Sequence, residues 1–328
     1  MKSFMHIDAE SVAHGVALLG KYKSKAKIIA GGTDLLGALK DEILPGYPEV
    51  IINIKGIPGL DRVEENEGGL KIGSPVKLSI IASSPLIRGR YPMLADAAQS
   101  VASPVIRRMG TIGGNLCQDV RCWYYRYPNP LGGRIMCHRK GRGSCPAVAG
   151  DNRYHAIMGG KVCFAVCPSD IAVALTALDA KIDVEGPKSS RTIPIKDFFT
   201  PLGNALQSDE MVTGIKLPPP PEKAKQTFLK FTLRKPIDFA IVSVASAVTV
   251  EEGICTRARI VLGSVAPMPL RATGAEEAVV GRTLDGSTAE DAADAAIAGA
   301  KPLSMNAYKV EIAKALIKRA ILGGIPGE

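Results

Sequence analysis

The sequence lacks any apolar run that approaches the roughly 20 residues a helix needs to cross a bilayer. Its first residues, MKSFMHIDAESVAHG, contain neither an apolar signal core nor a small-residue cleavage site. We therefore expect a cytoplasmic protein that neither crosses a membrane nor binds to one.

Several chemical signatures are also missing. No GxGxxG and no GxxxxGK[ST] is present, which excludes the Rossmann and P-loop fingerprints. Aromatic residues make up only 5% of the chain, and no recognition-helix pattern accompanies the net charge of +9, so we predict no nucleic-acid partner. Anionic cofactors or an acidic redox partner explain the positive charge equally well. The four histidines offer little for acid–base catalysis: His6, His14, His138 and His155.

Cysteine is scarce outside one segment. Of the seven cysteines only Cys255 lies elsewhere, and six fall between positions 117 and 167: Cys117, Cys122, Cys137, Cys145, Cys163 and Cys167. Disulfides are rare in a reducing compartment, so this grouping favours a metal site. Residues 117–167, called the cysteine segment below, are rich in Gly, Pro and Arg and have almost no periodicity. A loop of this length is uncommon unless something other than a hydrophobic core holds it.

The rest of the chain alternates helical and strand-like patterns, which predicts an α+β fold. Residues 1–60 form a first small unit, a second unit follows, and the prolines at 218–221 mark a boundary before the last unit. Ser287 and Glu290 have the spacing of a helix-capping box. The main predicted elements are helices at 11–19 and 308–322, strands at 26–30, 50–54, 70–73, 239–250 and 258–265, a helix followed by a strand within 169–186, and a hairpin turn at 67–69.

Two glycine-rich turns stand out. AGGTDL (Ala30–Leu35) follows a predicted strand, and TIGGN (Thr111–Asn115) is its counterpart in the second unit. Adjacent glycines let backbone N–H groups point into one concavity, and such a nest binds anions. Thr33, Thr111 and Asn115 can add side-chain hydrogen bonds, so the two turns together could hold a pyrophosphate. The alternative is that both are ordinary connecting turns without a ligand.

The two turns also carry a family resemblance. IIAGGTDLL and IRRMGTIGGNLC resemble the FAD-binding medium subunits of the molybdenum hydroxylases, such as xanthine dehydrogenase and CO dehydrogenase. The likeness continues, in order, through PSDIAVALTALDA, EMVTGIKLP, FLKFTLRKPIDFAIVSVA, GSVAPMPLRA and NAYKVEIAKALIKRA. It implies a two-subdomain FAD-binding domain of the PCMH or CO dehydrogenase flavoprotein type at 1–220 (subdomains about 1–60 and 61–220). The cysteine segment is inserted into it, and a smaller C-terminal α+β domain follows at 223–328.

The resemblance also implies a flavin site. The pyrophosphate would be held by the two turns, Val101 would lie near the flavin or ribityl chain, and Asp170 would hydrogen-bond cofactor hydroxyls. Val212 would add an apolar or backbone contact, and Lys230 would approach the isoalloxazine ring. Without the resemblance, a solvated lysine and a helix-capping aspartate are the simpler interpretations of Lys230 and Asp170. The complete set is Ile28, Ile29, Ala30, Gly31, Gly32, Thr33, Asp34, Leu35, Val101, Thr111, Ile112, Gly113, Gly114, Asn115, Asp170, Val212 and Lys230.

The cysteine segment resembles an insertion in one relative, the β subunit of 4-hydroxybenzoyl-CoA reductase, which carries a [4Fe–4S] cluster besides FAD. NLCQDVRC at its start and CFAVCPSD at its end carry this likeness, which implies four ligands: Cys122, Cys137, Cys145 and Cys163. Cys167 is the alternative fourth ligand, Cys117 would pack behind the flavin turn, and Cys255 would be structural. Zinc, with or without His138, is the competing hypothesis, although most of the cysteine gaps are too wide and uneven for zinc knuckles.

Basic residues crowd the cysteine segment: Arg121, Arg126, Arg134, Arg139, Lys140 and Arg142. They could stabilise a reduced cluster, be solvated, or dock an acidic carrier such as a ferredoxin. We predict an electron-transfer subunit with FAD and [4Fe–4S]. By resemblance its partners are a large molybdopterin subunit, which carries the substrate chemistry, and a small [2Fe–2S] subunit, in a dimer of heterotrimers. The alternatives are a stand-alone flavin oxidase and a zinc-stabilised basic binding protein.

Overall fold

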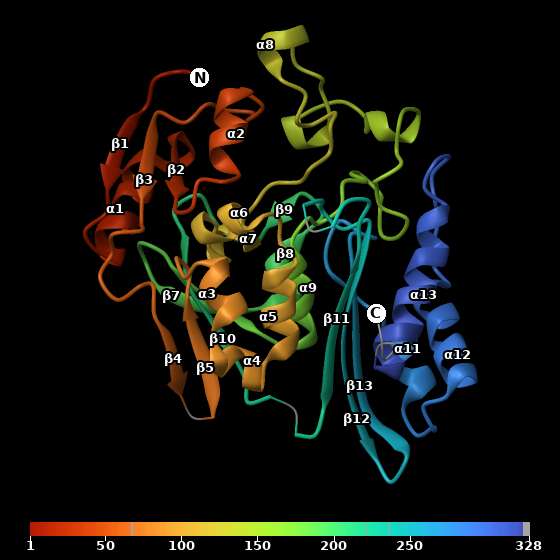
Figure 1. Ribbon diagram of the computed structural model, residues 1–328. Helices are drawn as coiled ribbons and strands as arrows, with labels where there is room; N and C mark the ends of the chain where they lie inside the picture. The colour runs from red at the N-terminus through yellow and green to blue at the C-terminus, as the bar shows by residue number, and fades with distance from the viewer. Residues whose placement is uncertain (67, 221, 236, 324–328) are drawn as a thin grey trace.

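Three larger β-sheets and one two-stranded ribbon organise the described part of the chain, and the cysteine segment crosses one end of the molecule (Figure 1). The structure, a computed structural model, describes residues 1–66, 68–220, 222–235 and 237–323. Its mixture of helices and mainly antiparallel sheets confirms the predicted α+β class. None of the helices in these described ranges combines the length and the apolarity that crossing a bilayer requires.

The first sheet is parallel, with strand order β1–β3–β2. Ser11 caps helix α1 by accepting a hydrogen bond from the His14 amide at 3.1 Å, as expected for a serine before a helical pattern. The predicted helix and both predicted strands of this unit are confirmed, with small shifts at their ends. The elements are β1 (Met5–Asp8), α1 (Val12–Tyr22), the 3₁₀ turn η1 (Lys23–Lys25), β2 (Ala26–Ile29), α2 (Leu35–Lys40) and β3 (Val50–Asn53).

The second sheet is antiparallel, with strand order β4–β5–β10–β6–β7, and its core includes a group of short helices. The predicted hairpin turn at 67–69 includes Glu67, which lies outside the described residues. Asn66, which precedes Glu67, pairs with Gly69. The elements are β4 (Val63–Asn66), β5 (Gly69–Gly73), α3 (Leu78–Ser83), α4 (Pro85–Arg90), α5 (Pro92–Gln99), α6 (Pro104–Met109), α7 (Ile112–Leu116), α9 (Asp170–Ala177), β6 (Lys181–Glu185), β7 (Ser190–Pro194), α10 (Ile195–Phe198), the ribbon β8 (Phe199–Thr200) and β9 (Gly203–Asn204), and β10 (Met211–Leu217).

The third sheet lies between helices on both faces: α5 and α9 contact one side, and the C-terminal helices cover the other (Figure 1). This double cover explains why β12 is buried along most of its length instead of alternating with exposed residues. The predicted capping box is wrong: Asp285 caps α12 by accepting from the Thr288 amide at 2.8 Å, because the helix begins at Gly286. The elements are β11 (Lys225–Phe231), β12 (Val242–Glu251), β13 (Ile254–Gly263), β14 (Leu270–Arg271), α11 (Thr273–Val279), α12 (Gly286–Ile297) and α13 (Tyr308–Leu322).

The cysteine segment is almost free of regular structure, as predicted. Within it are a single-turn helix and two 3₁₀ turns: α8 (Asn129–Gly132), η2 (His138–Lys140) and η3 (Pro146–Val148). A small core of its own packs against the α2 region and includes Val120, Tyr125 and Ala165. On the opposite side the segment reaches the start of α13, so it spans from the first unit to the last (Figure 1).

Candidate cofactor-binding site

A cavity of about 770 Å³ lies where all three units meet. The first glycine turn, the start of α7, the start of α9 and strand β11 each contribute to its wall. Every predicted flavin residue except Ile112 lines this cavity. The Ile112 side chain is instead fully buried in the core of the second unit.

The first glycine turn is tightly packed and keeps its amides available. A Cβ on Gly31 would lie 2.3 Å from the Met109 carbonyl oxygen, so only glycine lets the two turns approach this closely. Gly32 has a φ of +70°, in the left-handed region that favours glycine. Within the described residues, the amides of Gly31, Gly32 and Thr33 donate to no protein acceptor. These donors fit an anionic group at the cavity wall.

The second glycine turn is different, and the prediction of an open amide nest there is wrong. Thr111 caps helix α7, and the four amides that follow it are all occupied by protein acceptors. They donate to Val76 O (2.9 Å), Ser74 O (2.9 Å), Thr111 Oγ1 (3.1 Å) and Thr111 O (2.8 Å). Asn115 Oδ1 accepts from Ser169 Oγ at 2.5 Å. The side-chain nitrogen of Asn115, Nδ2, and the hydroxyl proton of Thr111 are therefore the donors of this turn that remain for a ligand.

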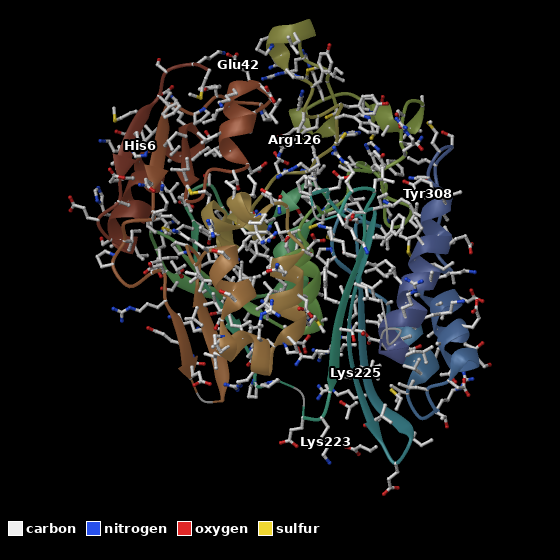
Figure 2. All side chains as sticks on the ribbon, viewed as in Figure 1. His6, Glu42, Arg126, Lys223, Lys225 and Tyr308 are labelled. Atoms are coloured by element: carbon white, nitrogen blue, oxygen red, sulfur yellow. The ribbon has the colours of Figure 1, made fainter. Side chains whose placement is uncertain are left out.

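Asp34 lines the cavity, but its carboxylate holds the cysteine segment. It lies 2.8 Å from Arg121 and 2.5 Å from Arg126, and it accepts from the Asp119 amide at 2.8 Å. Arg126 lies between α2 and the rest of the cysteine segment (Figure 2). Burial lowers the pKa of Arg121 to about 10 although Asp34 opposes the shift, so this guanidinium stays charged at neutral pH. Asp34 is thus an anchor between the first turn and the segment.

Asp170 and Lys230 form a buried ion pair of 2.7 Å at the cavity wall. Lys230 also donates to Ser100 O at 3.0 Å. Burial raises the pKa of Asp170, and the charge of Lys230 opposes that shift. Both simpler interpretations fail here, because the Lys230 side chain is only 8% exposed and Ser169, not Asp170, caps α9.

The four predicted cluster ligands, Cys122, Cys137, Cys145 and Cys163, line one small second cavity of about 20 Å³. Cys117 and Cys167 line the large cavity instead. An extended chain advances roughly 3.3 Å per residue, so four residues are enough to separate Cys163 from Cys167. The expectation that Cys117 is buried is wrong, since it is exposed. Cys255 is buried in the core of the third sheet.

The thiols of the small cavity influence one another. Burial raises the pKa of Cys122 to about 11, and the nearby Cys163 and Cys145 add to the rise. His155 Nε2 lies 3.3 Å from Cys122 Sγ, and burial lowers the pKa of His155 to about 4. The Cys122 thiol therefore stays protonated at neutral pH unless a cation or an iron centre stabilises its anionic form.

Two cationic side chains next to this cavity have a buried nitrogen without a hydrogen-bond partner in the described structure, although Arg139 pairs with Asp119 through another nitrogen. Among the described residues, neither Arg139 Nε nor Lys140 Nζ has one, and Lys140 is 5% exposed. Burial lowers the pKa of Lys140, while Cys137 and Cys122 oppose that effect. The Lys140 ammonium, which has no hydrogen-bond partner among the described residues, lies beside these thiols and fits an anionic occupant. In the same described part of the chain, no three His, Cys, Asp or Glu side chains converge as one metal ion would need.

A common wall separates the two cavities. In the described structure, Tyr125 and Arg139 are the residues that line both. Asp119 joins them: it accepts from the Tyr125 hydroxyl at 2.5 Å and lies 3.5 Å from Arg139. Nothing local in the sequence marks a residue that borders two sites. Tyr125 and Asp119 were therefore not predicted, and Arg139 was predicted only as one of several cations of the cysteine segment.

Comparisons with known proteins place the chain in one family. The family model "FAD binding domain in molybdopterin dehydrogenase" matches residues 2–124 and 131–220. The model "CO dehydrogenase flavoprotein C-terminal domain" matches residues 227–323. The chain therefore belongs to the FAD-binding medium subunits of the molybdenum hydroxylases, and the predicted fold and family are confirmed.

Individual relatives match this chain over nearly its whole length. The aldehyde oxidoreductase FAD-binding subunit of Escherichia coli is 34% identical over 324 residues, covering 96% of each chain. The carbon monoxide dehydrogenase medium chain of Hydrogenophaga pseudoflava is 30% identical, covering 95% of this chain and 93% of that one. The solved structure of carbon monoxide dehydrogenase from H. pseudoflava superimposes with a TM-score of 0.79 at 28% identity, covering 98% and 97%. The closer likeness to 4-hydroxybenzoyl-CoA reductase stays a prediction.

Proposed function

We propose that this chain transfers electrons between an external carrier and the other subunits of a molybdenum hydroxylase, using FAD in the large cavity and a [4Fe–4S] cluster in the small one. The observation that carries the proposal is the shared wall: Tyr125 and Arg139 border both cavities. Two redox groups placed this way would be neighbours. FAD supplies the exchange between two-electron and one-electron transfer when it is bound.

The residues of the large cavity suit a dinucleotide. The amides at Gly31 to Thr33 would hold the pyrophosphate, assisted by Asn115. The Lys230 ammonium, fixed by Asp170 and the Ser100 carbonyl, would place a positive charge beside the ring system. Val101 and Val212 supply apolar wall. The ammonium of Lys230 would favour the anionic reduced flavin.

The residues of the small cavity suit an iron–sulfur cluster better than a single ion. A single zinc needs its ligands at one point, about 2.3 Å from each sulfur, and the described side chains offer no such convergence. A cubane spreads its four thiolates over four iron atoms, so they can stand farther apart. Cys122, Cys137, Cys145 and Cys163 would be the ligands, with Arg139 and Lys140 as charge partners.

The positive charge of the cysteine segment also supports protein partners for this chain. This chain would join a large molybdopterin subunit and a small [2Fe–2S] subunit, in a dimer of heterotrimers located in the cytoplasm. From 121 to 167 the segment has eight Lys and Arg residues and one acidic residue, Asp151. An acidic one-electron carrier such as a ferredoxin would find complementary charge there.

A stand-alone flavin oxidase is less consistent with the cavity. Such an enzyme needs a free base near the flavin. The carboxylates that line the cavity are each ion-paired, and no histidine of the described residues lines it. The pairs are Asp34 with Arg121 and Arg126, Asp119 with Arg139, Asp170 with Lys230, Glu210 with Arg191 and Asp238 with Arg234.

The test is the content of iron, acid-labile sulfide, zinc and FAD in anaerobically purified protein. Wild type is compared with Cys163→Ser and with the matched control Cys167→Ser. We expect about four irons and four sulfides per FAD, lost in Cys163→Ser and retained in Cys167→Ser. Zinc in place of iron, or FAD without metal, contradicts the cluster. Retention of iron in Cys163→Ser with loss in Cys167→Ser contradicts the assignment of the fourth ligand.

A further inference from the structure

His155 is a buried side chain in hydrogen-bond contact with a predicted cluster ligand. It is 3% exposed, and its Nε2 lies 3.3 Å from Cys122 Sγ. No local sequence pattern distinguishes it from the other histidines. Its position between the small cavity and the start of α13 becomes evident only in three dimensions.

The ring is held on several sides. Trp123 and Tyr124 contact it with ring centroids 5.9 and 6.1 Å away. The backbone carbonyl of His155 accepts hydrogen bonds from Asn306 Nδ2 at 3.1 Å and from Lys309 Nζ at 3.0 Å. Tyr308, which precedes Lys309 at the start of α13, donates to Arg153 O beside this site (Figure 2). With both backbone and ring restrained, the contact between Nε2 and sulfur is a fixed feature.

The environment also determines which atom donates. The other ring nitrogen, Nδ1, is buried and has no hydrogen-bond partner among the described residues. A proton on Nδ1 would be a buried donor without an acceptor, which is rare and costly. A proton on Nε2 lies within hydrogen-bond distance of the Cys122 sulfur, and this sulfur accepts a hydrogen bond when it is a thiolate. The geometry therefore favours donation from Nε2–H to Cys122.

We propose that His155 is a positioning residue for the cluster: its Nε2–H donates to Cys122 sulfur and raises the reduction potential of the [4Fe–4S] centre. This inference rests on the proposed function. When the cluster takes up one electron from a carrier, negative charge increases on its sulfur ligands. A hydrogen bond to one of them stabilises the reduced form more than the oxidised form.

The experiment compares His155→Leu, which removes the donor, with His155→Gln, which keeps an N–H donor. The midpoint potential of the cluster is measured in the full complex by dye-mediated titration with dithionite, followed by EPR. We expect a more negative potential for His155→Leu, a value close to wild type for His155→Gln, and unchanged iron and FAD content in both. His138→Leu is the matched control, because His138 also lines the small cavity but makes no hydrogen bond to sulfur in the described structure.

A second measurement does not depend on the leucine variant folding. Protein labelled with [¹⁵N]histidine is reduced, and its EPR signal is searched for a weak ¹⁵N hyperfine coupling. The coupling should be present in wild type and His138→Leu and absent in His155→Gln. An unshifted potential in His155→Leu, or no coupling in wild type, overturns this inference but leaves the proposed function intact. A strong coupling with iron loss in both His155 variants also overturns it, since His155 would then be a ligand. Absence of iron from wild type refutes the proposed function itself.

Discussion

The two cavities are neighbours, but they are built in opposite ways. The large cavity is lined by the ends of regular elements, which the three packed cores fix in place. The small cavity is lined by an irregular segment with one single-turn helix and two 3₁₀ turns among its described residues. Its stability therefore depends on individual side-chain anchors and, in our proposal, on the cluster itself.

The anchors are polar and lie at both ends of the segment. Asp34 binds Arg121 and Arg126 on the side of the first unit. Asn152 donates to Ser304 at 3.0 Å and accepts from the Met305 amide at 2.9 Å on the side of the last unit. The large cavity is therefore shaped by the packed elements of the fold, whereas the small cavity is held between the first and last units by individual side-chain contacts. We therefore expect a substitution that disrupts one site to leave the other intact.

The largest effect on cofactor content concerns the large cavity only. Gly31→Ala places a Cβ 2.3 Å from Met109 O, a backbone atom that cannot turn aside. The two turns must separate, so we expect FAD content to fall at least tenfold, a loss of roughly 1.4 kcal/mol or more in cofactor affinity. Iron content should remain that of wild type. Absorbance at flavin wavelengths and iron assay measure both quantities on one sample.

Gly37→Ala is the matched control for this variant. Gly37 lies in α2, and a Cβ there meets no atom within 4 Å. The substitution should leave FAD content unchanged and stabilise the chain by about 0.5–1 kcal/mol, because alanine is a better helix former. Equal FAD loss in both variants would mean that the packing between the two turns is not what holds the cofactor.

The next effect concerns the buried pair of the large cavity. Lys230→Met leaves the Asp170 carboxylate buried without its cation, and we expect the free energy of unfolding to fall by about 3–5 kcal/mol. Asp170→Asn added to Lys230→Met should recover part of that loss. Denaturant unfolding measures both. Lys216→Met, which removes the half-exposed partner of Asp183, should cost about 1 kcal/mol or less; equal losses in the two lysine variants would contradict the argument.

Features encoded within a few residues were predictable, and those formed between distant residues were not. The helix Tyr308–Leu322 was predicted to the residue because its apolar spacing and its C-terminal glycine are local signals. The available amides of the first glycine turn also follow from its local sequence. The occupied amides of the second turn do not, because their acceptors include Ser74 and Val76 on another loop. The contact of His155 with Cys122 joins residues 33 positions apart, and no spacing rule reports it.

The last effect is a pH dependence of stability on the side of the small cavity. Lys309 is fully buried and donates to the carbonyls of His155 and Ser264, and burial lowers its pKa to about 7. Between pH 7 and about 10.5 the unfolded chain binds a proton that the folded chain does not. Wild type should therefore lose stability as the pH falls through this range, by at most roughly 1.4 kcal/mol per pH unit, with no further loss from this group below pH 7.

Lys309→Met should remove this contribution to the slope, which unfolding measurements at pH 7, 8 and 9 can detect. Lys318→Met is the control on the same helix. Lys318 is partly exposed and pairs with Glu290, so its replacement should leave the wild-type slope in place. A slope unchanged in Lys309→Met would mean that the buried amine is not the titrating group. A slope lost together with faster proteolysis of the cysteine segment, at unchanged FAD content, would show that this lysine supports the small cavity and not the large one.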